Sequence, residues 1–188
     1  MSDKIRQKQR GKSSNIMRWG TAKECAYLAV FVALVIAAQL VFSAIPGIEL
    51  VTVLFVGHSF VFGVKRGMLA TTAFSILRQL VFGFFINVLV LYLVYYNLLT
   101  FFFGWLGNRQ RKVRLWGIIV FACLFTMGFT LADNLITIWI NGLTARAARV
   151  YIYASLSVMF TQTICAGVSV AVLFFPLKRV FNTVKKRL

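Results

Sequence analysis

Residues 21–44, TAKECAYLAVFVALVIAAQLVFSA, form an apolar run of the length of a membrane span, and 45–49, IPGIE, interrupts it. Within the run Ala29, Ala33 and Ala37 repeat every fourth residue. Residues four apart lie on one face of a helix, and small side chains on that face let a second helix approach closely. We therefore expect a membrane helix over 21–44 that presents a groove for a partner helix.

The composition of the whole chain indicates an integral membrane protein. Of its 188 residues 60% are hydrophobic, 15% are aromatic and only 13% are charged, and the mean hydropathy is +0.83. A water-soluble domain of this size does not carry so much apolar side chain. The formal net charge of +17 is compatible with nucleic-acid binding, so the positions of the basic residues matter more than their number.

The basic residues are clustered. All of the 21 Lys and Arg residues except Arg78, Arg146 and Arg149 fall in four groups. Because short loops rich in Lys and Arg stay in the cytoplasm, we place all four groups on that side and expect the terminal ones to contact anionic lipid and no nucleic acid. The groups are Lys4, Arg6, Lys8, Arg10, Lys12, Arg18 and Lys23; Lys65 and Arg66; Arg109, Arg111, Lys112 and Arg114; and Lys178, Arg179, Lys185, Lys186 and Arg187.

Three apolar intervals separate these groups, at 24–64, 67–107 and 115–177. Each can hold an outward and a returning span, since a bilayer core needs about 20 helical residues. The predicted fold is an all-α integral membrane protein, a bundle of six transmembrane helices between cytoplasmic tails at 1–20 and 178–188. The expected helices are 21–44, 49–63, 67–84, 87–107, 115–140 and 150–175, the last ending before Pro176.

The N-terminal region could also be read as a signal peptide, because Val41-Phe42-Ser43 resembles a cleavage site. We reject this reading. The basic region is longer than usual, the apolar run is as long as a span, and cleavage would leave five helices with one basic group outside. Six retained helices account better for the charges.

Ionisable groups inside a bilayer cost roughly 2.5 to 3.5 kcal/mol on insertion scales, so each needs an explanation. Four qualify: Glu49, His58, Arg78 and Asp133. Counting about 1.5 Å per residue from the cytoplasmic ends places Arg78 and Asp133 in the outer half, with Gln39 at a similar depth. Glu49 and Arg146 fall at the outer rim. These groups predict one polar site that opens outward.

Two polar stripes strengthen this prediction. One runs along 115–140 and the other along 150–175, each with the spacing of a single helix face. They can line a binding site, or they can hold helices together by hydrogen bonds. The stripes are Thr126, Thr130, Asp133, Thr137 and Asn141, and Tyr151, Ser155, Gln162 and Ser169. The candidate solute-binding residues are Gln39, Glu49, Arg78, Asp133, Asn134, Thr137, Arg146, Tyr151 and Gln162.

Two interpretations of Arg78 stay open. It can form a buried ion pair with Asp133, or it can bind a carboxylate or phosphate of a solute, and the pair could open to admit such a ligand. Aromatic side chains could stack on a flat heterocycle, although packing and interface belts account for most of them. These are Tyr92, Tyr95, Tyr96, Trp139, Tyr151 and Tyr153.

We find no pattern that indicates catalysis, a cofactor or a metal. No Gly-rich loop ends in Gly-Lys-Ser or Gly-Lys-Thr, and neither clustered histidines nor paired carboxylates occur. His58 stands alone and is expected to hydrogen bond between helices. Cys25, Cys123 and Cys165 have no paired spacing and are expected to be small apolar fillers. Energy for any transport must then come from elsewhere.

The pattern resembles the substrate-binding S component of energy-coupling factor transporters, a branch of the ATP-binding-cassette importers. The topology is similar over the whole length. The similarity is sharpest in Ala29, Ala33 and Ala37, which match the small-residue motif on the first helix of that family, and in 45–52, IPGIELVT. The ending Phe175-Pro176-Leu177 before a basic tail is also similar.

The resemblance implies a six-helix bundle in a prokaryotic plasma membrane that captures a vitamin or related micronutrient from outside, with the loop after the first helix helping to cover the pocket. The alanine face would dock on a membrane scaffold subunit coupled to two cytoplasmic ATPases. The loaded subunit would then topple to present its ligand inside. Alternatives are a self-sufficient small carrier or channel and, less favoured, a membrane enzyme or assembly factor.

Overall fold

The computed structural model describes residues 22–45, 48–108 and 114–188, and this part of the chain is helical apart from short connections. The expected basic N-terminal tail, the Pro46-Gly47 turn and Arg109, Arg111 and Lys112 lie outside the described residues. The helices are α2 (Ala22–Phe42), α3 (Val51–Phe62), α4 (Val64–Phe82), α5 (Ile86–Asn108), α6 (Leu115–Ile140) and α7 (Ala145–Arg187).

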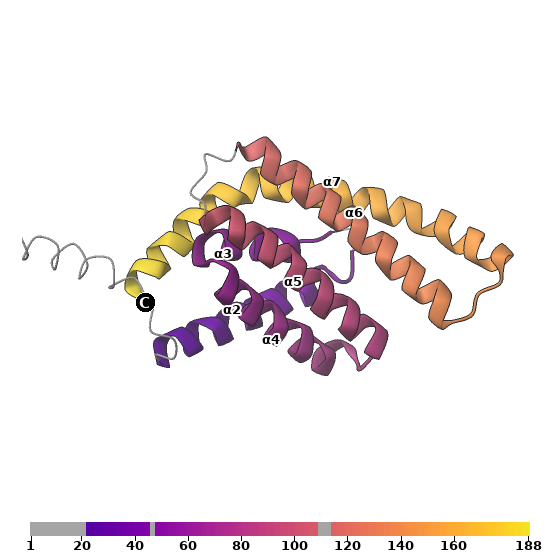
Figure 1. The fold of residues 1–188 in the computed structure, drawn as a ribbon, viewed down its shortest axis with the longest axis horizontal. Helices are drawn as coiled ribbons and strands as arrows, with labels where there is room; N and C mark the ends of the chain where they lie inside the picture. The colour runs from indigo at the N-terminus through magenta and orange to yellow at the C-terminus, as the bar shows by residue number, and fades with distance from the viewer. Residues whose placement is uncertain (1–21, 46–47, 109–113) are drawn as a thin grey trace, which may run out of the picture.

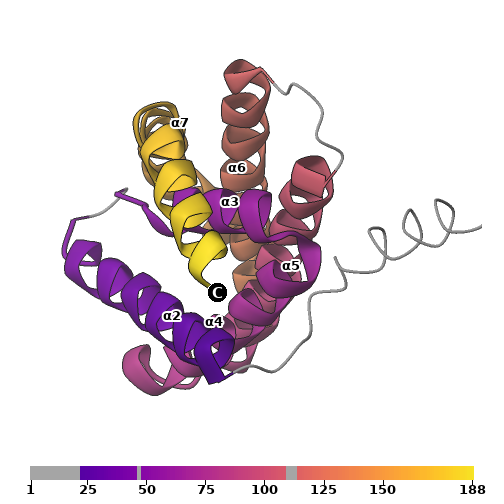
Figure 2. The ribbon, with the colours of Figure 1, turned by 90° about the vertical axis from the view of Figure 1, so that its left-hand side faces the viewer.

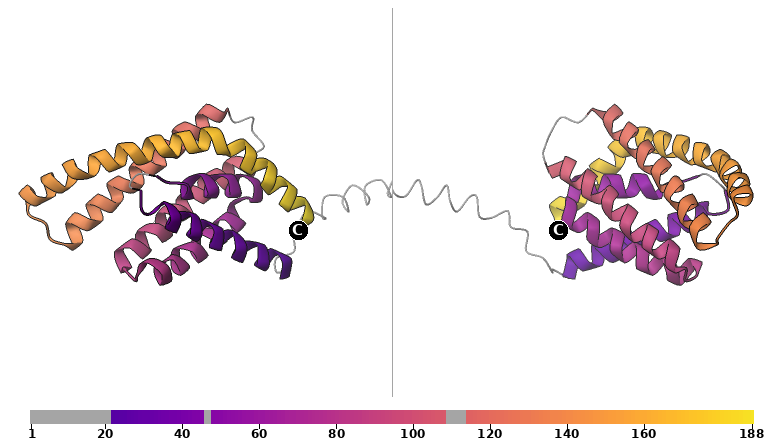
Figure 3. Two further views of the ribbon diagram at one scale, coloured as in Figure 1. Left: turned by 180° about the vertical axis from the view of Figure 1, so that it is seen from behind. Right: turned by 45° about the vertical axis from the view of Figure 1, so that its right-hand side comes forward.

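The helices are arranged around α3. Viewed from one end, α3 lies near the centre and the other five surround it (Figure 2). The α6–α7 hairpin is the longest part and extends beyond the other helices (Figure 1), as the view from behind also shows (Figure 3). The C-terminus lies at the end of the bundle where α2 begins (Figures 1 and 3).

Helix α3 forms the centre of the core. All of its residues except Phe60 are buried, and it contacts each of the other five described helices. With 12 residues it is about 18 Å long, which is well short of a hydrocarbon core of about 30 Å. The expected second span at 49–63 is therefore too short as observed to cross a bilayer by itself.

Four helices are long and apolar enough to cross a membrane: α2, α5, α6 and α7. Helix α4 has 19 residues but is less apolar, because it carries Lys65, Arg66 and Arg78. The chain is thus an all-helical protein with four candidate membrane-spanning helices. Six crossings and two cytoplasmic termini stay predictions.

Two tryptophans mark the ends of α6. Trp116 is 76% exposed and Trp139 is 83% exposed. They are separated along the helix by roughly 35 Å. Tryptophan is enriched where a spanning helix leaves the hydrocarbon, and this separation is close to the core thickness of about 30 Å. α6 therefore has the dimensions of a complete span.

Most expected boundaries lie within three residues of the observed ones, and that of α6 coincides at both ends. The second basic group does not form the expected loop, because Lys65 and Arg66 lie in the first turn of α4. Gly63 alone separates α3 from α4, with φ of +85°, a conformation that glycine adopts at little cost. The turn lets Arg66 pair with Glu24 on α2.

The expected end of the last helix before Pro176 is wrong, and so is its start at residue 150. Helix α7 continues for 43 residues with Pro176 inside it, so 178–188 is mostly helix and not a separate tail. Proline removes one helical hydrogen bond and bends the chain, and the last part of α7 bends toward the bundle (Figure 1). The unfavourable free energy of the proline is offset by an apolar stripe that packs on the core. The stripe consists of Leu177, Phe181, Val184 and Leu188.

Ring contacts and a hydrogen bond attach the end of α7 to α3. The Phe181 ring is 6% exposed and meets the His58 ring edge-on at a centroid distance of 5.9 Å. The Lys185 Nζ donates a hydrogen bond of 2.6 Å to the carbonyl oxygen of Val61. The last turns are therefore part of the packed structure.

Substitution of Phe181 by alanine tests this packing. Removing a buried phenylalanine leaves a cavity, so we expect Phe181→Ala to lower the free energy of unfolding by about 3 kcal/mol. The neighbouring Val180 is 56% exposed and provides the control, since Val180→Ala opens no cavity. Thermal unfolding of the purified variants in detergent measures both. Equal stability of the two variants would contradict the packed end of α7.

Candidate functional site

Two adjoining cavities lie between the helices. The larger has a volume of about 430 Å³ and is lined by α4, α5, α6 and α7. The second, of about 320 Å³, extends toward α2 and the segment before α3. Both sizes are within the range of small-molecule sites. The cavities share five lining residues: Arg78, Tyr92, Phe129, Val158 and Gln162.

Arg78 lies where the two cavities meet, and three side chains hold it. Its Nε donates a hydrogen bond of 3.0 Å to Oε1 of Gln39. Its Cζ lies 4.2 Å from the centre of the Tyr92 ring and 4.7 Å from that of Phe82. Gln39 in turn donates from Nε2 to the Tyr92 hydroxyl, at 3.2 Å. Aromatic faces attract a guanidinium, so this cradle orients the cation without neutralising it.

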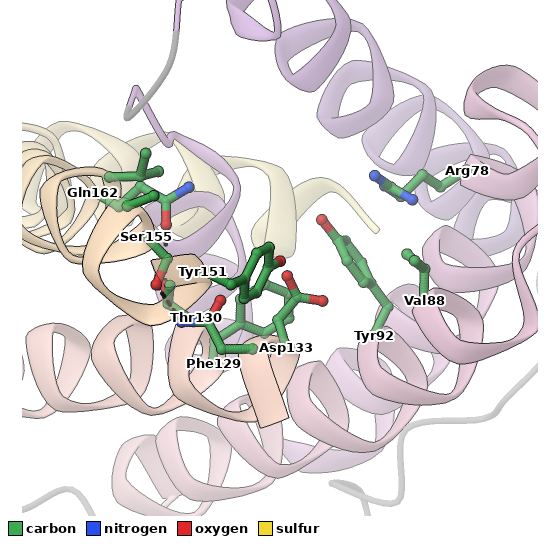
Figure 4. Close-up of a pocket in the computed structure, with 12 residues that line it drawn as sticks. Arg78, Val88, Tyr92, Phe129, Thr130, Asp133, Tyr151, Ser155 and Gln162 are labelled. Atoms are coloured by element: carbon green, nitrogen blue, oxygen red, sulfur yellow. Dashed lines mark hydrogen bonds between the residues drawn. The ribbon is translucent and has the colours of Figure 1, made fainter. Parts of the chain in front are cut away.

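Of the two interpretations of Arg78, the ion pair with Asp133 is not present among the described residues, where Arg66 and Glu24 make the only ion pair. Instead the two side chains point into the larger cavity from opposite sides (Figure 4). Within the same part of the chain, the Asp133 carboxylate and the Nη atoms of Arg78 have no hydrogen-bond partner. Opposite charges thus face one space without contact.

The polar stripes of α6 and α7 meet beside this space. The Thr130 hydroxyl donates to Oε1 of Gln162 at 3.1 Å, and Nδ2 of Asn134 donates to the Ser155 hydroxyl at 2.7 Å. All four residues also line the larger cavity. The two readings of the stripes are therefore compatible, because the same side chains join the helices and line the cavity.

Glu49, just before α3, is held by contacts with α3, α5 and α7. Its Oε1 accepts hydrogen bonds from the Thr52 hydroxyl at 2.7 Å and from the Tyr96 hydroxyl at 3.0 Å. Its main-chain N–H faces Sγ of Cys165 on α7, at 3.4 Å. Glu49 lines the second cavity with Arg78, so a second carboxylate belongs to the joined space.

Two of the predicted binding residues lie elsewhere. Thr137 lines neither cavity. Arg146 lines a separate surface pocket at the start of α7, which Tyr151 also borders. The structure brings the other seven together around the two cavities: Gln39, Glu49, Arg78, Asp133, Asn134, Tyr151 and Gln162.

Sequence reasoning missed part of the aromatic wall. Phe82 and Phe129 were not singled out, and Tyr92 and Tyr96 were named only as general aromatic candidates. A signal for one of these contacts was present in the spacing. Phe82 follows Arg78 by four residues, which places it on the same helix face.

His58 does not form the hydrogen bonds between helices that its sequence position suggested. It is fully buried, and neither ring nitrogen has a partner among the described residues. Its ring stacks instead on Phe31 at 4.3 Å and Phe62 at 4.8 Å. Described residues contain no group of three or more His, Cys, Asp or Glu side chains that could hold a metal ion.

The alanines of α2 lie away from the cavities. Ala29, Ala33 and Ala37 are all exposed, whereas the opposite face of α2 buries Phe31 and Val35. The exposed face also carries large apolar side chains, among them Val30, Leu34, Leu40 and Val41.

Comparisons of the chain with models of protein families, with curated proteins and with solved structures gave no match.

The role of Tyr92 in holding Arg78 can be measured by stability. We expect Tyr92→Phe to lose only the hydrogen bond from Gln39, about 1 kcal/mol, because its ring still faces the guanidinium. Tyr92→Leu should cost at least about 1 kcal/mol more, since it also removes the cation–π contact and the ring contacts with Phe74, Tyr96 and Phe129. Chemical or thermal unfolding in detergent gives the order. Equal losses in the two variants would argue against the ring contact.

Proposed function

We propose that this chain is the solute-binding membrane subunit of an energy-coupling-factor type importer in a prokaryotic plasma membrane. It captures a vitamin or related micronutrient at the outer face and delivers it inward together with a scaffold subunit and two cytoplasmic ATPases. The observation that carries the proposal is the joined cavity around Arg78, whose cation is oriented by three neighbours yet left unneutralised. A guanidinium that is held in position but has no anionic partner favours the binding of an anionic ligand group.

The position of the basic residues supports an outward opening. Lys65 and Arg66 lie beside the start of α2, and the basic end of α7 attaches at the same end of the bundle through Lys185. Gln39, near the end of α2, borders the second cavity, so the cavity lies toward the opposite end. By the rule that basic segments stay inside, the cavity faces outward.

The exposed alanine face supports a separate docking surface. Without a hydrophobic driving force inside lipid, helices associate through close packing of small residues. Ala29, Ala33 and Ala37 lie on the exposed side of α2, and Gln39 turns inward to Tyr92. Solute capture and attachment to the scaffold can then use different faces of the same helix.

Thiol labelling in intact cells tests the orientation. Cys25 is exposed at the start of α2, so in a variant that keeps only this cysteine we expect labelling by a membrane-impermeant maleimide only after permeabilisation. In a cysteine-free background, Asp133→Cys should be labelled in intact cells, because Asp133 lines the outward cavity. Labelling of Cys25 in intact cells would contradict the proposed orientation.

Reconstitution tests the coupling. Liposomes that contain the chain with a scaffold and two ATPases should accumulate the solute that copurifies with it, as identified by mass spectrometry, only when ATP is present. Ala33→Trp should abolish assembly with the scaffold while leaving solute affinity within about twofold, because it fills the docking groove and not the cavity. Ala171→Trp, at an exposed position of α7, is the matched control and should assemble normally.

Two outcomes would count against this function. Uptake by the chain alone would favour the self-sufficient carrier, and normal assembly of the Ala33→Trp variant would remove the docking assignment.

A further inference from the structure

The geometry points to a zwitterionic solute with a flat ring: Arg78 binds its anionic group, Asp133 binds its cationic nitrogen, and Phe129 and Tyr151 contact the ring. We propose this as the chemical class of ligand for the larger cavity. The inference rests on the proposed function in one respect only, namely that the cavity captures a solute.

We infer the anionic group of the ligand from the N–H donors of Arg78 that have no acceptor among the described residues. A guanidinium carries five N–H donors, and among the described residues only Nε donates, to Gln39. The two Nη groups face the cavity as a planar fork (Figure 4). This fork suits the two oxygens of a carboxylate, and Tyr92 and Phe82 already hold it in place.

The cationic end follows from Asp133. Its carboxylate lines the same cavity from α6, on the side opposite Arg78, and has no hydrogen-bond or ion-pair partner in the part of the chain that the structure describes. An ionised group in such a place normally pairs with something. A protonated amine on the ligand provides both the opposite charge and N–H donors.

The charges around the joined space disfavour ligands with a single charge. Asp133 and Glu49 contribute two carboxylates against one guanidinium. A purely anionic ligand would pair with Arg78 but would leave the Asp133 carboxylate without a partner. A purely cationic ligand would displace water from the cavity and would leave the Nη groups of Arg78 without a partner. Leaving a desolvated charge unpaired is expensive, so a ligand that bridges both walls is favoured.

The remaining walls suit a flat apolar body. Phe129 and Tyr151 line the larger cavity beside Asp133, and Tyr92 lines it beside Arg78 (Figure 4). Val88 and Val158 complete the apolar surface. Aromatic rings favour stacked or edge-on contact with another ring. A volume of about 430 Å³ accommodates a small bicyclic molecule with a short charged side chain.

Three probes with one ring system separate the charges. L-Tryptophan is zwitterionic at pH 7, tryptamine carries only the ammonium and 3-indolepropionate only the carboxylate. We expect the purified full chain in lipid nanodiscs, measured by calorimetric titration, to bind tryptophan at least tenfold more tightly than either analogue. Because the chain is used alone, this measurement is independent of the scaffold and of ATP.

Two variants test whether Arg78 binds the carboxylate of the probe and Asp133 binds its ammonium group. Arg78→Gln should remove the preference for tryptophan over tryptamine but keep the preference over 3-indolepropionate. Asp133→Asn should do the reverse. Arg146→Gln, which removes a cation from a separate surface pocket, is the matched control and should change none of the three affinities. Unfolding temperatures without ligand establish that each variant is folded.

Several outcomes would overturn the inference. They are tight binding of either singly charged analogue, equal losses for all three probes in both variants, or no binding of any probe by the folded wild-type chain. None of these outcomes would refute the proposed importer, since ATP-dependent uptake of a solute of another chemical class would still establish it. Conversely, a zwitterion that binds as expected but is transported without partner subunits would refute the importer and keep the ligand class.

Discussion

Burial of α3 is the constraint on which the rest of the structure depends. This helix of 12 residues is enclosed by the five other described helices, and nearly every side chain of it is covered. Because all of its surroundings are protein, its ends can be set by turns and not by the bilayer. The single-residue connection at Gly63 then fixes where α4 begins, and α4 presents Arg78 to the cavities.

The handling of charge differs between the two ends of the bundle. Near the start of α2, Arg66 is neutralised directly by Glu24. At the cavities, Arg78 contacts two aromatic rings and the Gln39 amide. The carboxyl groups of Asp133 and Glu49 line the same joined space but do not contact Arg78. Direct pairing satisfies the charge of Arg66 within the fold, whereas the Nη groups of Arg78 are left for the ligand that we propose. This contrast is the physical basis on which we propose a solute-binding role for Arg78 and not for Arg66.

Local signals explain which boundaries were predictable. The limits of α6 follow from Arg114 before it and from the Asn141-Gly142 turn after it, where Gly142 has φ of +57°. The end of α7 was not predictable from Pro176 alone, because proline disfavours a helix interior and only packing can offset its cost. The stripe from Leu177 to Leu188 contained that information, but its significance depends on a core that lies far away in the sequence.

By itself, the sequence determined the helical content, the apolar segments long enough to span a membrane and the polar stripes on single helix faces, because composition and helical periodicity are properties of single segments. It also placed Arg78, Asp133 and Gln162 among the residues of one site. Only the tertiary structure decided that Arg78 and Asp133 stand apart, that Glu49 belongs to the same space and that Tyr92 and Phe82 hold the guanidinium. The reason is that distances between side chains of different helices depend on how the helices cross. The spacing of residues along one helix carries no information about those distances.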